Sequence, residues 1–513
     1  MKANWLNDAV FYEIYPQSFR DSDGDGIGDI NGIREKLDYI RSLGCNAIWI
    51  NACFDSPFRD GGYDVRDYKK VAPRYGTNED LCALFREAHE KEMHVLLDLV
   101  AGHTSEEHSW FLHSGSASRT PYDDRYIWTD GWLADADHLT CIRGECARDG
   151  GYIVNFFKCQ PALNYGFLHP AAPWQHTPDH PSVRATCEAI VDVMRFWLSK
   201  GCDGFRADMA DSLVKNDDGQ KSGTCAVWKM MREMLDEEYP GAVLVSEWGI
   251  PGQALRAGFN ADFYLDWSGN GYNSLMRDYE TDGEDRSYFK KDAGGSICRF
   301  LNEYLPRYQD TKNLGHISMI TGNHDTIRAA HTLSQAELKL AYAVLFTLPG
   351  VPFLYYGDEI GMRHLELPTK EGGYHRTGSR TPMQWHSGPN LGFSEAPAES
   401  LYLPVDRAPD APTVAGQEQV PASLLQTVRT LIWLRHEQEE LHAGGSFEVL
   451  SAEPAQPFVY RRGNLICAVN PDGCGREVQL ESPRRILFQI GSGHFSDGIL
   501  CLGAQSFVIA EQS

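Results

Sequence analysis

The stretch VLLDLVAGH, residues 95–103, decides how the rest of the sequence is interpreted. It begins with a nearly continuous apolar run and ends in small and polar residues. Such a run predicts a β-strand that is covered on both faces, as in a parallel sheet with helices outside it. A strand with one face in water would instead alternate apolar and polar residues.

Seven further apolar runs of the same kind are spread along the chain. The segments between them, such as NEDLCALFREAHEKE (78–92), carry apolar residues at helical spacing. Eight strands, each followed by a helix, predict an α/β fold, the closed (β/α)8 TIM barrel. An open doubly wound sheet has the same local pattern, so periodicity leaves the closure of the sheet undecided. The seven runs are 10–19, 47–54, 204–210, 242–248, 263–269, 317–325 and 351–362.

Two segments break this rhythm. Residues 104–181 are rich in aromatics, Gly, His and Asp with weak helical spacing, which predicts an insertion domain after the third strand. From residue 445 the pattern changes to short alternating runs such as FVYRRGNLICAVN (458–470), which predicts a C-terminal antiparallel β-sandwich domain. We therefore expect a barrel of residues 1–103 and 182–444, an insertion domain of residues 104–181 and a C-terminal domain of residues 445–513.

The composition limits the partners of this chain. Its 513 residues carry a formal net charge of −24, so nucleic acid and anionic membrane, which attract clustered Lys and Arg, are not expected as partners. No apolar run approaches the roughly 20 residues that span a bilayer. The 13 Cys form no CxxC pair and the first residues lack a basic and apolar leader, so we expect a cytoplasmic protein with reduced thiols. The oligomeric state is not predicted.

Acidic residues recur where the predicted strands end, and that end of a barrel presents the catalytic groups. Glu247 follows Asp208 by 39 positions, about one strand and helix, and Asp325 follows Glu247 by 78, about two. These three acids can therefore converge from different strands on one pocket. The acidic residues at predicted strand ends are Asp98, Asp208, Glu247, Asp325, Asp358 and Glu359.

Three acids at one barrel mouth repel one another, so at least one pKa should be raised, which prepares a general acid beside an ionised nucleophile. Glycoside cleavage with retention needs such a pair about 5–5.5 Å apart, and neighbouring strands can supply that separation. Arg206, two residues before Asp208, would face the same side of its strand and keep Asp208 ionised. The same spacing also fits an Arg206–Asp208 ion pair that merely fills the barrel.

The loop DSDGDGIGDI, residues 21–30, has the spacing of a calcium site. Carboxylates stand at its first, third and fifth positions, Gly26 at the sixth and the backbone carbonyl of Ile27 at the seventh. The twelfth position is Gly32 instead of a bidentate Glu, which excludes a complete EF-hand. An acidic, solvated turn is the alternative.

Four motifs, in this order, resemble the α-amylase superfamily, glycoside hydrolase family 13. They are DLVAGH (98–103), GFRADMADS (204–212), SEWG (246–249) and TGNHD (321–325). Further stretches resemble its oligo-1,6-glucosidase, α-glucosidase and dextran glucosidase branch, and they extend the likeness over nearly the whole chain. These stretches are GYDVRDYKKVAPRYGT (62–77), GDEIGM (357–362) and SRTPMQW (379–385).

The resemblance implies a role for each acid. Asp208 corresponds to the nucleophile, Glu247 to the acid/base, and Asp325 to the carboxylate that binds sugar hydroxyls and stabilises the transition state. Matching positions also imply six substrate-binding residues and a structural calcium ion held by five residues. The substrate-binding residues are Asp60, Tyr63, His103, Arg206, His324 and Arg380, and the calcium ligands are Asp21, Asp23, Asp25, Ile27 and Asp29.

The implied function is a retaining, exo-acting α-glucosidase that hydrolyses short α-1,4- or α-1,6-linked glucosides through a covalent glucosyl-enzyme. A transglucosylase, a sucrose- or trehalose-acting isomerase, or an α-amylase on the same scaffold is the alternative. The resemblance does not fix the linkage, because Met209 follows the nucleophile position where α-1,6-specific members commonly have Val. Two other classes are disfavoured. A non-catalytic transporter subunit would need a membrane anchor, and no apolar run here is long enough to span a bilayer. An α/β oxidoreductase would need GxGxxG after the first strand, and that motif does not follow it here.

Overall fold

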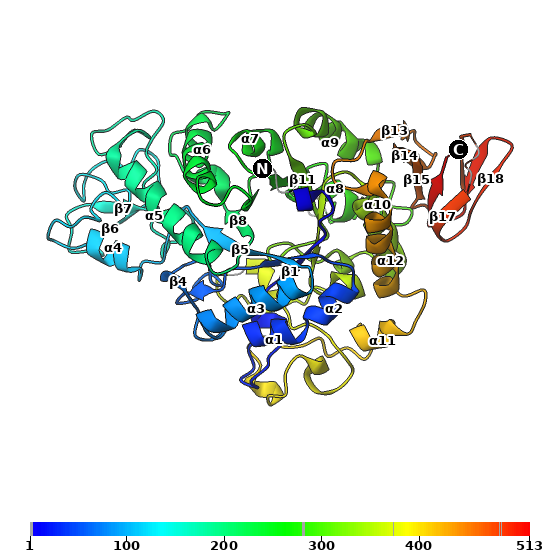
Figure 1. Cartoon of the computed structure of the whole chain (residues 1–513), viewed down its shortest axis with the longest axis horizontal. Helices are drawn as coiled ribbons and strands as arrows, with labels where there is room; N and C mark the ends of the chain where they lie inside the picture. Colours follow the sequence, from blue (N-terminus) through cyan, green and yellow to red (C-terminus); the bar gives the residue numbers. More distant parts are fainter. Residues whose placement is uncertain (1–3, 280–282, 373, 482, 484, 513) are drawn as a thin grey trace.

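The chain folds into a barrel with an insertion at one end and a β domain at the other (Figure 1). The computed structural model describes residues 4–279, 283–372, 374–481, 483 and 485–512. Residues 1–3, 280–282 and 373 of the predicted barrel, and 482, 484 and 513 of the predicted C-terminal domain, lie outside the described residues.

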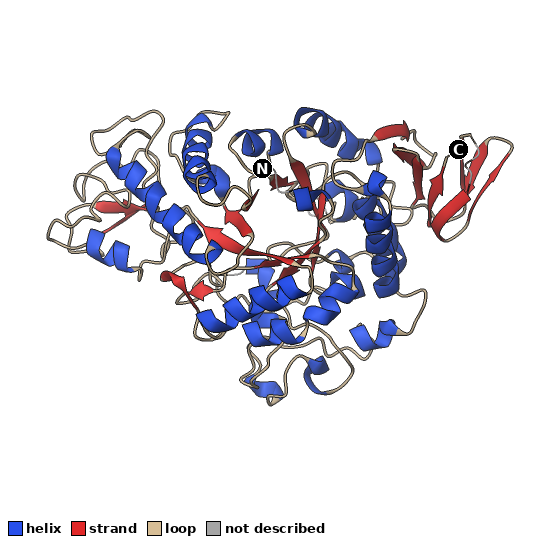
Figure 2. Cartoon of the chain, in the orientation of Figure 1, coloured by secondary structure: helices blue, strands red, loops and turns tan. Residues whose placement is uncertain are grey.

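Eight parallel strands form the barrel, in the order β1-β12-β11-β10-β9-β8-β5-β2. The first strand pairs with both the second and the last, so the sheet is closed and the open doubly wound alternative is wrong. Figure 2 shows these strands at the centre of the molecule with helices around them. The barrel strands are β1 (Phe11–Ile14), β2 (Ala47–Ile50), β5 (His94–Val100), β8 (Gly204–Asp208), β9 (Val243–Ser246), β10 (Ala261–Phe263), β11 (His316–Ile320) and β12 (Val351–Tyr355).

The continuous apolar runs have the physical cause that the sequence indicated. Strands β2, β8, β9 and β12 are buried at every position, because helices cover the outside and side chains fill the inside. The sixth strand was predicted too late: β10 ends at Phe263, where the run 263–269 begins. The residues after it leave the sheet, with Asp266 in an ion pair with Arg277 and Trp267 half exposed.

Several helices around the barrel, such as α3 and α9, are amphipathic, and both of these have a capped N-terminus. In α3, Thr77 and Asp80 form a reciprocal capping box that satisfies two backbone N–H groups at the helix start. The last barrel helix is α12 (Leu424–Glu437). The helices are α1 (Ile30–Glu35), α2 (Leu37–Ser42), α3 (Asn78–Glu90), α4 (Ser109–Ser114), α5 (Pro181–Leu198), α6 (Ser222–Asp236), α7 (Pro251–Arg256), α8 (Asn273–Met276), α9 (Ile297–Thr311), α10 (Gln335–Thr347), α11 (Val414–Glu418) and α12.

The segment after β5 leaves the barrel and returns at α5. It contains α4 and a short hairpin of β6 (Cys141–Arg143) and β7 (Gly151–Ile153). A small apolar cluster of its own, which includes Ile127, Ile153 and Trp174, holds it together. A second excursion, the β3–β4 hairpin (Phe54–Asp55 and Asp67–Val71), follows β2. Both excursions leave from the carboxyl ends of barrel strands, where catalytic groups are presented.

The C-terminal domain consists of two antiparallel sheets, as predicted. One has the order β13-β14-β15-β20-β17 and the other β16-β19-β18. Val459, Ile466 and Val508 of the first sheet pack with Leu500 and Leu502 of the second, so the two sheets face each other. The strands are β13 (Glu448–Ser451), β14 (Phe458–Arg462), β15 (Leu465–Asn470), β16 (Arg476–Gln479), β17 (Arg485–Ile490), β18 (Gly493–Ser496), β19 (Ile499–Leu502) and β20 (Ser506–Glu511).

Among the described residues, no helix combines the length and the apolar character that crossing a bilayer requires.

Candidate active site

The three predicted catalytic acids line one cavity at the carboxyl ends of the barrel strands. Asp208 is the last residue of β8, Glu247 follows β9 directly, and Asp325 lies in the loop after β11. The cavity has a volume of about 180 Å³. It is lined by Asp60, Tyr63, His103, Phe156, Asp208, Met209, Glu247, Asp325 and Arg376.

Arg206, on β8, contacts three carboxyl groups at this end of the barrel. Its Nη1 lies 2.7 Å from Oδ1 of Asp98 and 3.0 Å from Oδ1 of Asp208, and its Nη2 lies 3.0 Å from Oε2 of Glu247. The backbone N–H of Met209 donates to the same Oε2 of Glu247 at 2.9 Å. Arg206 is thus in a buried ion pair, but this pair does more than fill the barrel, because two of its three carboxyl partners line the cavity.

One guanidinium cannot neutralise three carboxylates, so the cluster favours a bound proton. Burial and the neighbouring Glu247 raise the pKa of Asp208 above the usual range of an aspartate, although Arg206 opposes the shift. Burial also raises the pKa of Glu247, with Arg206 lowering it and Asp325 raising it. Asp208 and Glu247 therefore titrate together and retain one proton at a pH where isolated carboxyls are ionised.

Asp325, in contrast, is held in its ionised form. Burial works against its charge, but His324, Arg380 and Arg376 outweigh that penalty and hold the pKa of Asp325 below its ordinary value. Its Oδ1 accepts hydrogen bonds from Arg380 (2.8 Å) and Arg376 (3.0 Å). The side chain of Asn323 accepts the backbone N–H of Asp325 at 2.9 Å, which fixes the loop. Asp325 is therefore an ionised carboxylate that faces the cavity.

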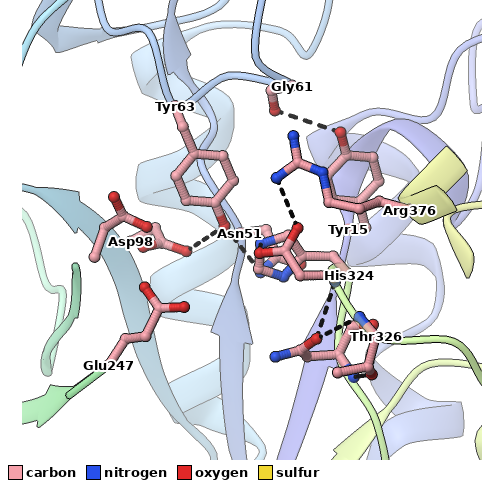
Figure 3. A network of polar contacts seen from close by, with 12 residues as sticks. Tyr15, Asn51, Gly61, Tyr63, Asp98, Glu247, His324, Thr326 and Arg376 are labelled. Carbon is pink, nitrogen blue, oxygen red and sulfur yellow. Dashed lines mark hydrogen bonds and ion pairs between the residues drawn. The ribbon is translucent and has the colours of Figure 1, made fainter. Parts of the chain in front are cut away.

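Glu247 and Arg376 reach toward the same space from opposite sides, with Tyr63 between them at its upper edge (Figure 3). The ring of Tyr63 stacks on His324 with 5.2 Å between centroids and 4° between planes. Its hydroxyl donates to Oδ2 of Asp98 at 2.9 Å. Tyr63 thus presents a fixed ring to the cavity, of the kind that can stack on a sugar.

Asp60 and His103 come from the two excursions that follow β2 and β5. Asp60 accepts hydrogen bonds from Arg376 and from Gln160, each at 2.8 Å. Nε2 of His103 lies 3.1 Å from the backbone carbonyl of Tyr63, and Asn155 lies 3.2 Å from Nδ1. Since Nε2 faces an acceptor and Nδ1 a donor, we assign the proton to Nε2. Burial lowers the pKa of His103 to about 4, so the ring is neutral at pH 7.

All nine predicted catalytic and substrate-binding residues therefore come together in one region. Six of them line the cavity, and Arg206, His324 and Arg380 lie directly behind it. The sequence reasoning missed three residues, namely Arg376, Phe156 and Gln160. Arg376 precedes the recognised Arg380 by four positions, which could have drawn attention to it. Nothing local in the sequence marks Phe156.

The predicted calcium loop brings together three of its five candidate ligands. Oxygen atoms of Asp21, Asp23 and Asp29 all lie within 4.8 Å of one another. Asp21 accepts backbone N–H groups of Gly24 (2.7 Å) and Gly26 (2.8 Å), which shapes the loop. The Asp25 carboxylate instead accepts the backbone N–H of Ile27 at 2.8 Å and is not in this group.

The donor set of this loop suits a hard cation. Three carboxylates converge, and oxygen atoms are the ligands that Ca²⁺ prefers. Burial raises the pKa of Asp29, and the negative charge of Asp23 adds to the effect, so a bound cation would relieve a real repulsion. Asp29 also caps α1 through the N–H of Gly32 at 2.7 Å, which ties the loop to the barrel.

Comparisons with known proteins agree with this geometry. Residues 13–444 match the model of the alpha amylase catalytic domain. The trehalose synthase/amylase TreS of Mycolicibacterium smegmatis is 32% identical over 90% of this chain and 81% of its own length. The probable oligo-1,6-glucosidase 3 of Bacillus subtilis is 31% identical over 90% of this chain and 89% of its own length. The crystal structure of an isomaltulose synthase mutant from Erwinia rhapontici NX5 with D-glucose covers 99% of both chains, with 26% identity and a TM-score of 0.82. The chain is therefore an enzyme of the α-amylase family, glycoside hydrolase family 13.

Proposed function

We propose that this enzyme is a retaining, exo-acting α-glucosidase that hydrolyses short α-1,4- or α-1,6-linked glucosides. The observation that carries the proposal is the pair of Asp208 and Glu247, which share the guanidinium of Arg206 and line one cavity. A pair of carboxyls that hold one proton between them can divide the roles of nucleophile and acid. Retention needs this division.

In the first half of the reaction, Asp208 attacks the anomeric carbon while Glu247 protonates the departing glycosidic oxygen. The bond between the sugar and the leaving alcohol breaks, and an ester between Asp208 and glucose forms. Arg206, which lies 3.0 Å from Oδ1 of Asp208, keeps this carboxylate ionised once the proton of the pair is on Glu247. In the second half, Glu247 removes a proton from water, which displaces Asp208 and releases glucose with the α configuration.

Positive charge develops on the sugar ring in the transition state, and Asp325 is suited to oppose it. Its carboxylate is ionised and aligned by Arg376, Arg380 and His324 before the substrate arrives. Preorganised charge of this kind needs no rearrangement during the reaction. The ring of Tyr63 lines the cavity, and the sugar can stack on it.

Exo action is supported by the small volume of the cavity. Its volume of about 180 Å³ is below the ~300–1,000 Å³ of pockets for drug-sized ligands, which suits a single sugar ring. Arg376 bridges Asp60 and Asp325 and so closes one side. An α-amylase needs an open cleft for long chains, so this bridge favours the α-glucosidase over the α-amylase alternative.

A transglucosylase or a sucrose- or trehalose-acting isomerase is the second candidate. The relatives named above include a trehalose synthase and an isomaltulose synthase. The same glucosyl-enzyme can be intercepted by a sugar instead of water. Products from maltose, isomaltose, sucrose and trehalose, followed by NMR, test the proposal. Free α-glucose supports the hydrolase, a rearranged disaccharide supports the isomerase, and long internal fragments from starch would overturn exo action.

We also propose that Asp21, Asp23 and Asp29, with Asp25 and the carbonyl of Ile27, hold a structural Ca²⁺. Support comes from the three converging carboxylates and the coupling of Asp29 to α1. The ion would stabilise the loop after β1. Asp208, Glu247 and Asp325 carry out the reaction without it, since none of them is among the loop residues.

A cytoplasmic location is proposed from the state of the cysteines. All 13 are free thiols in the described chain, and several, such as Cys45 and Cys187, are buried in the apolar core. An oxidising compartment would favour disulfides in a protein so rich in cysteine. Titration of free thiols in protein taken directly from cells tests this point.

A further inference from the structure

Glu13, on β1, has no part in the mechanism above, yet its side chain reaches the active-site network. Its Oε1 lies 3.0 Å from Nδ1 of His324 and 3.1 Å from Nδ2 of Asn51. On the other side of the imidazole, Nε2 of His324 lies 3.3 Å from Oδ2 of Asp325. A continuous chain of polar contacts therefore runs from Glu13 inside the barrel to the carboxylate that faces the cavity.

The imidazole of His324 cannot change its orientation easily. It lies between the rings of Tyr63 and Tyr15, with interplanar angles of 4° and 10°, and Figure 3 shows His324 together with both tyrosines and Asn51. Its backbone carbonyl also accepts a hydrogen bond from Arg380 at 2.8 Å. With the ring plane fixed, the remaining variable is which ring nitrogen carries the proton. The group bonded to the opposite nitrogen decides this.

The surroundings of Glu13 favour its neutral form. It is fully buried, and Oε2 has no hydrogen-bond partner among the described residues. An ionised carboxylate would leave that oxygen without a donor, which is far more costly than leaving a neutral carbonyl oxygen unpaired. The nearest guanidinium that acts on it, Arg206, is already bonded to three other carboxyls. Burial raises the pKa of Glu13 well above its ordinary value and lowers that of His324 well below its own.

Asn51 completes the arrangement around Glu13. Its Nδ2 lies 3.1 Å from Oε1 of Glu13, 3.1 Å from Nδ1 of His324 and 3.4 Å from the hydroxyl of Tyr63. Because the Tyr63 hydroxyl donates to Asp98, its oxygen is free to accept from Asn51. One amide N–H can thus go to each oxygen. The amide has two N–H groups for three acceptors, so when they bond the two oxygens, the proton of Glu13 is left to bond Nδ1 of His324.

We propose that Glu13 is a positioning residue that acts as a neutral acid: it donates its carboxyl proton to Nδ1 of His324, so that Nε2 carries the proton that faces Oδ2 of Asp325. In the opposite tautomer, the lone pair of Nε2 would face the Asp325 carboxylate and repel it. Glu13 therefore helps to fix both the position and the charge of Asp325. The consequence for the rate rests on the proposed glucosidase function, whereas the proton arrangement does not.

The proton arrangement can be measured without any substrate. The full-length protein is labelled with ¹⁵N-histidine, and His324 is assigned by the resonances that disappear in His324→Gln. Between pH 5 and 8 we expect one protonated nitrogen, Nε2, and one unprotonated nitrogen, Nδ1. Two protonated nitrogens, or a proton on Nδ1 alone, would overturn the proposal, whatever reaction the enzyme catalyses.

Two substitutions of Glu13 separate donation from packing. Glu13→Gln keeps a neutral donor of the same shape, so we expect a nearly unchanged kcat and the same His324 tautomer. Glu13→Met keeps the volume but removes the donor, so kcat should fall about 10- to 100-fold, as for outer partners of functional histidines, with a smaller change in KM. Equal losses in both variants would overturn the role as donor. Thermal unfolding checks that each variant is folded. If Glu13→Met does not fold, the NMR measurement on Glu13→Gln still tests the proposal.

Discussion

Arg376 donates a hydrogen bond of 3.0 Å to Asp325, although the two residues lie 51 positions apart in the sequence. The same guanidinium donates to Asp60 at 2.8 Å. One side chain therefore connects the loop after β11 with the excursion after β2. This bridge closes the cavity on one side and is the structural basis for the proposed preference for terminal glucose.

Replacement of Arg376 by Ala should lower kcat/KM for maltose and isomaltose about 10- to 100-fold, the loss expected for one or two hydrogen bonds to charged groups. Longer maltooligosaccharides should lose less, because the opened cavity admits chains that the bridge excludes. Steady-state kinetics across chain lengths measure this. Arg363→Ala is the matched control, since Arg363 pairs with Asp406 and Asp410 outside the cavity. The same loss at every chain length would contradict the role in closure.

Phe156 should contribute to binding of the leaving sugar. It lines the cavity from the insertion domain, yet its side chain is 51% exposed. An aromatic face in that position gains contact area only when a substrate covers it. We expect Phe156→Ala to raise KM for disaccharides several-fold with little change in kcat. Trp433→Ala, a similarly exposed aromatic on α12, should leave both constants unchanged. A reduced kcat with an unchanged KM for Phe156→Ala would contradict this account.

The pH dependence of kcat/KM should be bell-shaped and shifted toward neutral pH. Burial raises the pKa values of both Asp208 and Glu247, so the pair loses its first proton above the usual carboxyl range. Activity falls below that point because the nucleophile is protonated, and it falls again when rising pH removes the proton of Glu247. Glu247→Gln should abolish the alkaline limb and lower kcat about 10²–10⁴-fold for natural disaccharides.

A substrate with an activated leaving group serves as the control for that variant. With α-glucosyl fluoride, no proton needs to be donated, so the first step of Glu247→Gln should remain fast. An equal loss with the fluoride and with maltose would contradict the role of Glu247 as an acid.

Removal of calcium should lower stability more than activity. Chelation, or Asp21→Asn, is expected to lower Tm because the loop loses the ion that joins its carboxylates, while kcat at 25 °C changes little. Calorimetry with added Ca²⁺ checks the first point, since a ligand that binds only the folded state raises Tm with concentration. Asp38→Asn, an exposed carboxylate on α2, is the control. A parallel loss of kcat in the calcium-free protein at low temperature would contradict a purely structural role.

The barrel strands were predictable because a strand that is buried on both faces has a nearly continuous run of apolar residues. Strand β8, for example, is buried from Gly204 to Asp208. Closure was not predictable, because it depends on the pairing of β1 with β12 across the whole chain. The sixth strand was placed too late, since the chain leaves the sheet after Phe263, where Asp266 pairs with Arg277 and Trp267 is half exposed.

The convergence of the three predicted catalytic acids could be inferred because they stand at strand ends, about one and two strand–helix units apart, and family motifs added the residues beside them. Arg376, Gln160 and Phe156 escaped because they lie on loops whose courses depend on packing between distant segments. Gln160, for example, reaches Asp60 from 100 positions away. The proposed calcium loop was identified by its spacing, but spacing does not show that the Asp25 carboxylate accepts the N–H of Ile27.

The central claim, that Asp208 is the nucleophile of a retaining reaction, is tested most directly by trapping the glucosyl-enzyme. The protein is incubated with 5-fluoro-α-glucosyl fluoride, digested and analysed by mass spectrometry. We predict one fluoroglucosyl group on the peptide that contains Asp208, and none in Asp208→Asn. A label on another carboxylate, or no label together with β-glucose as the first product, would contradict the account.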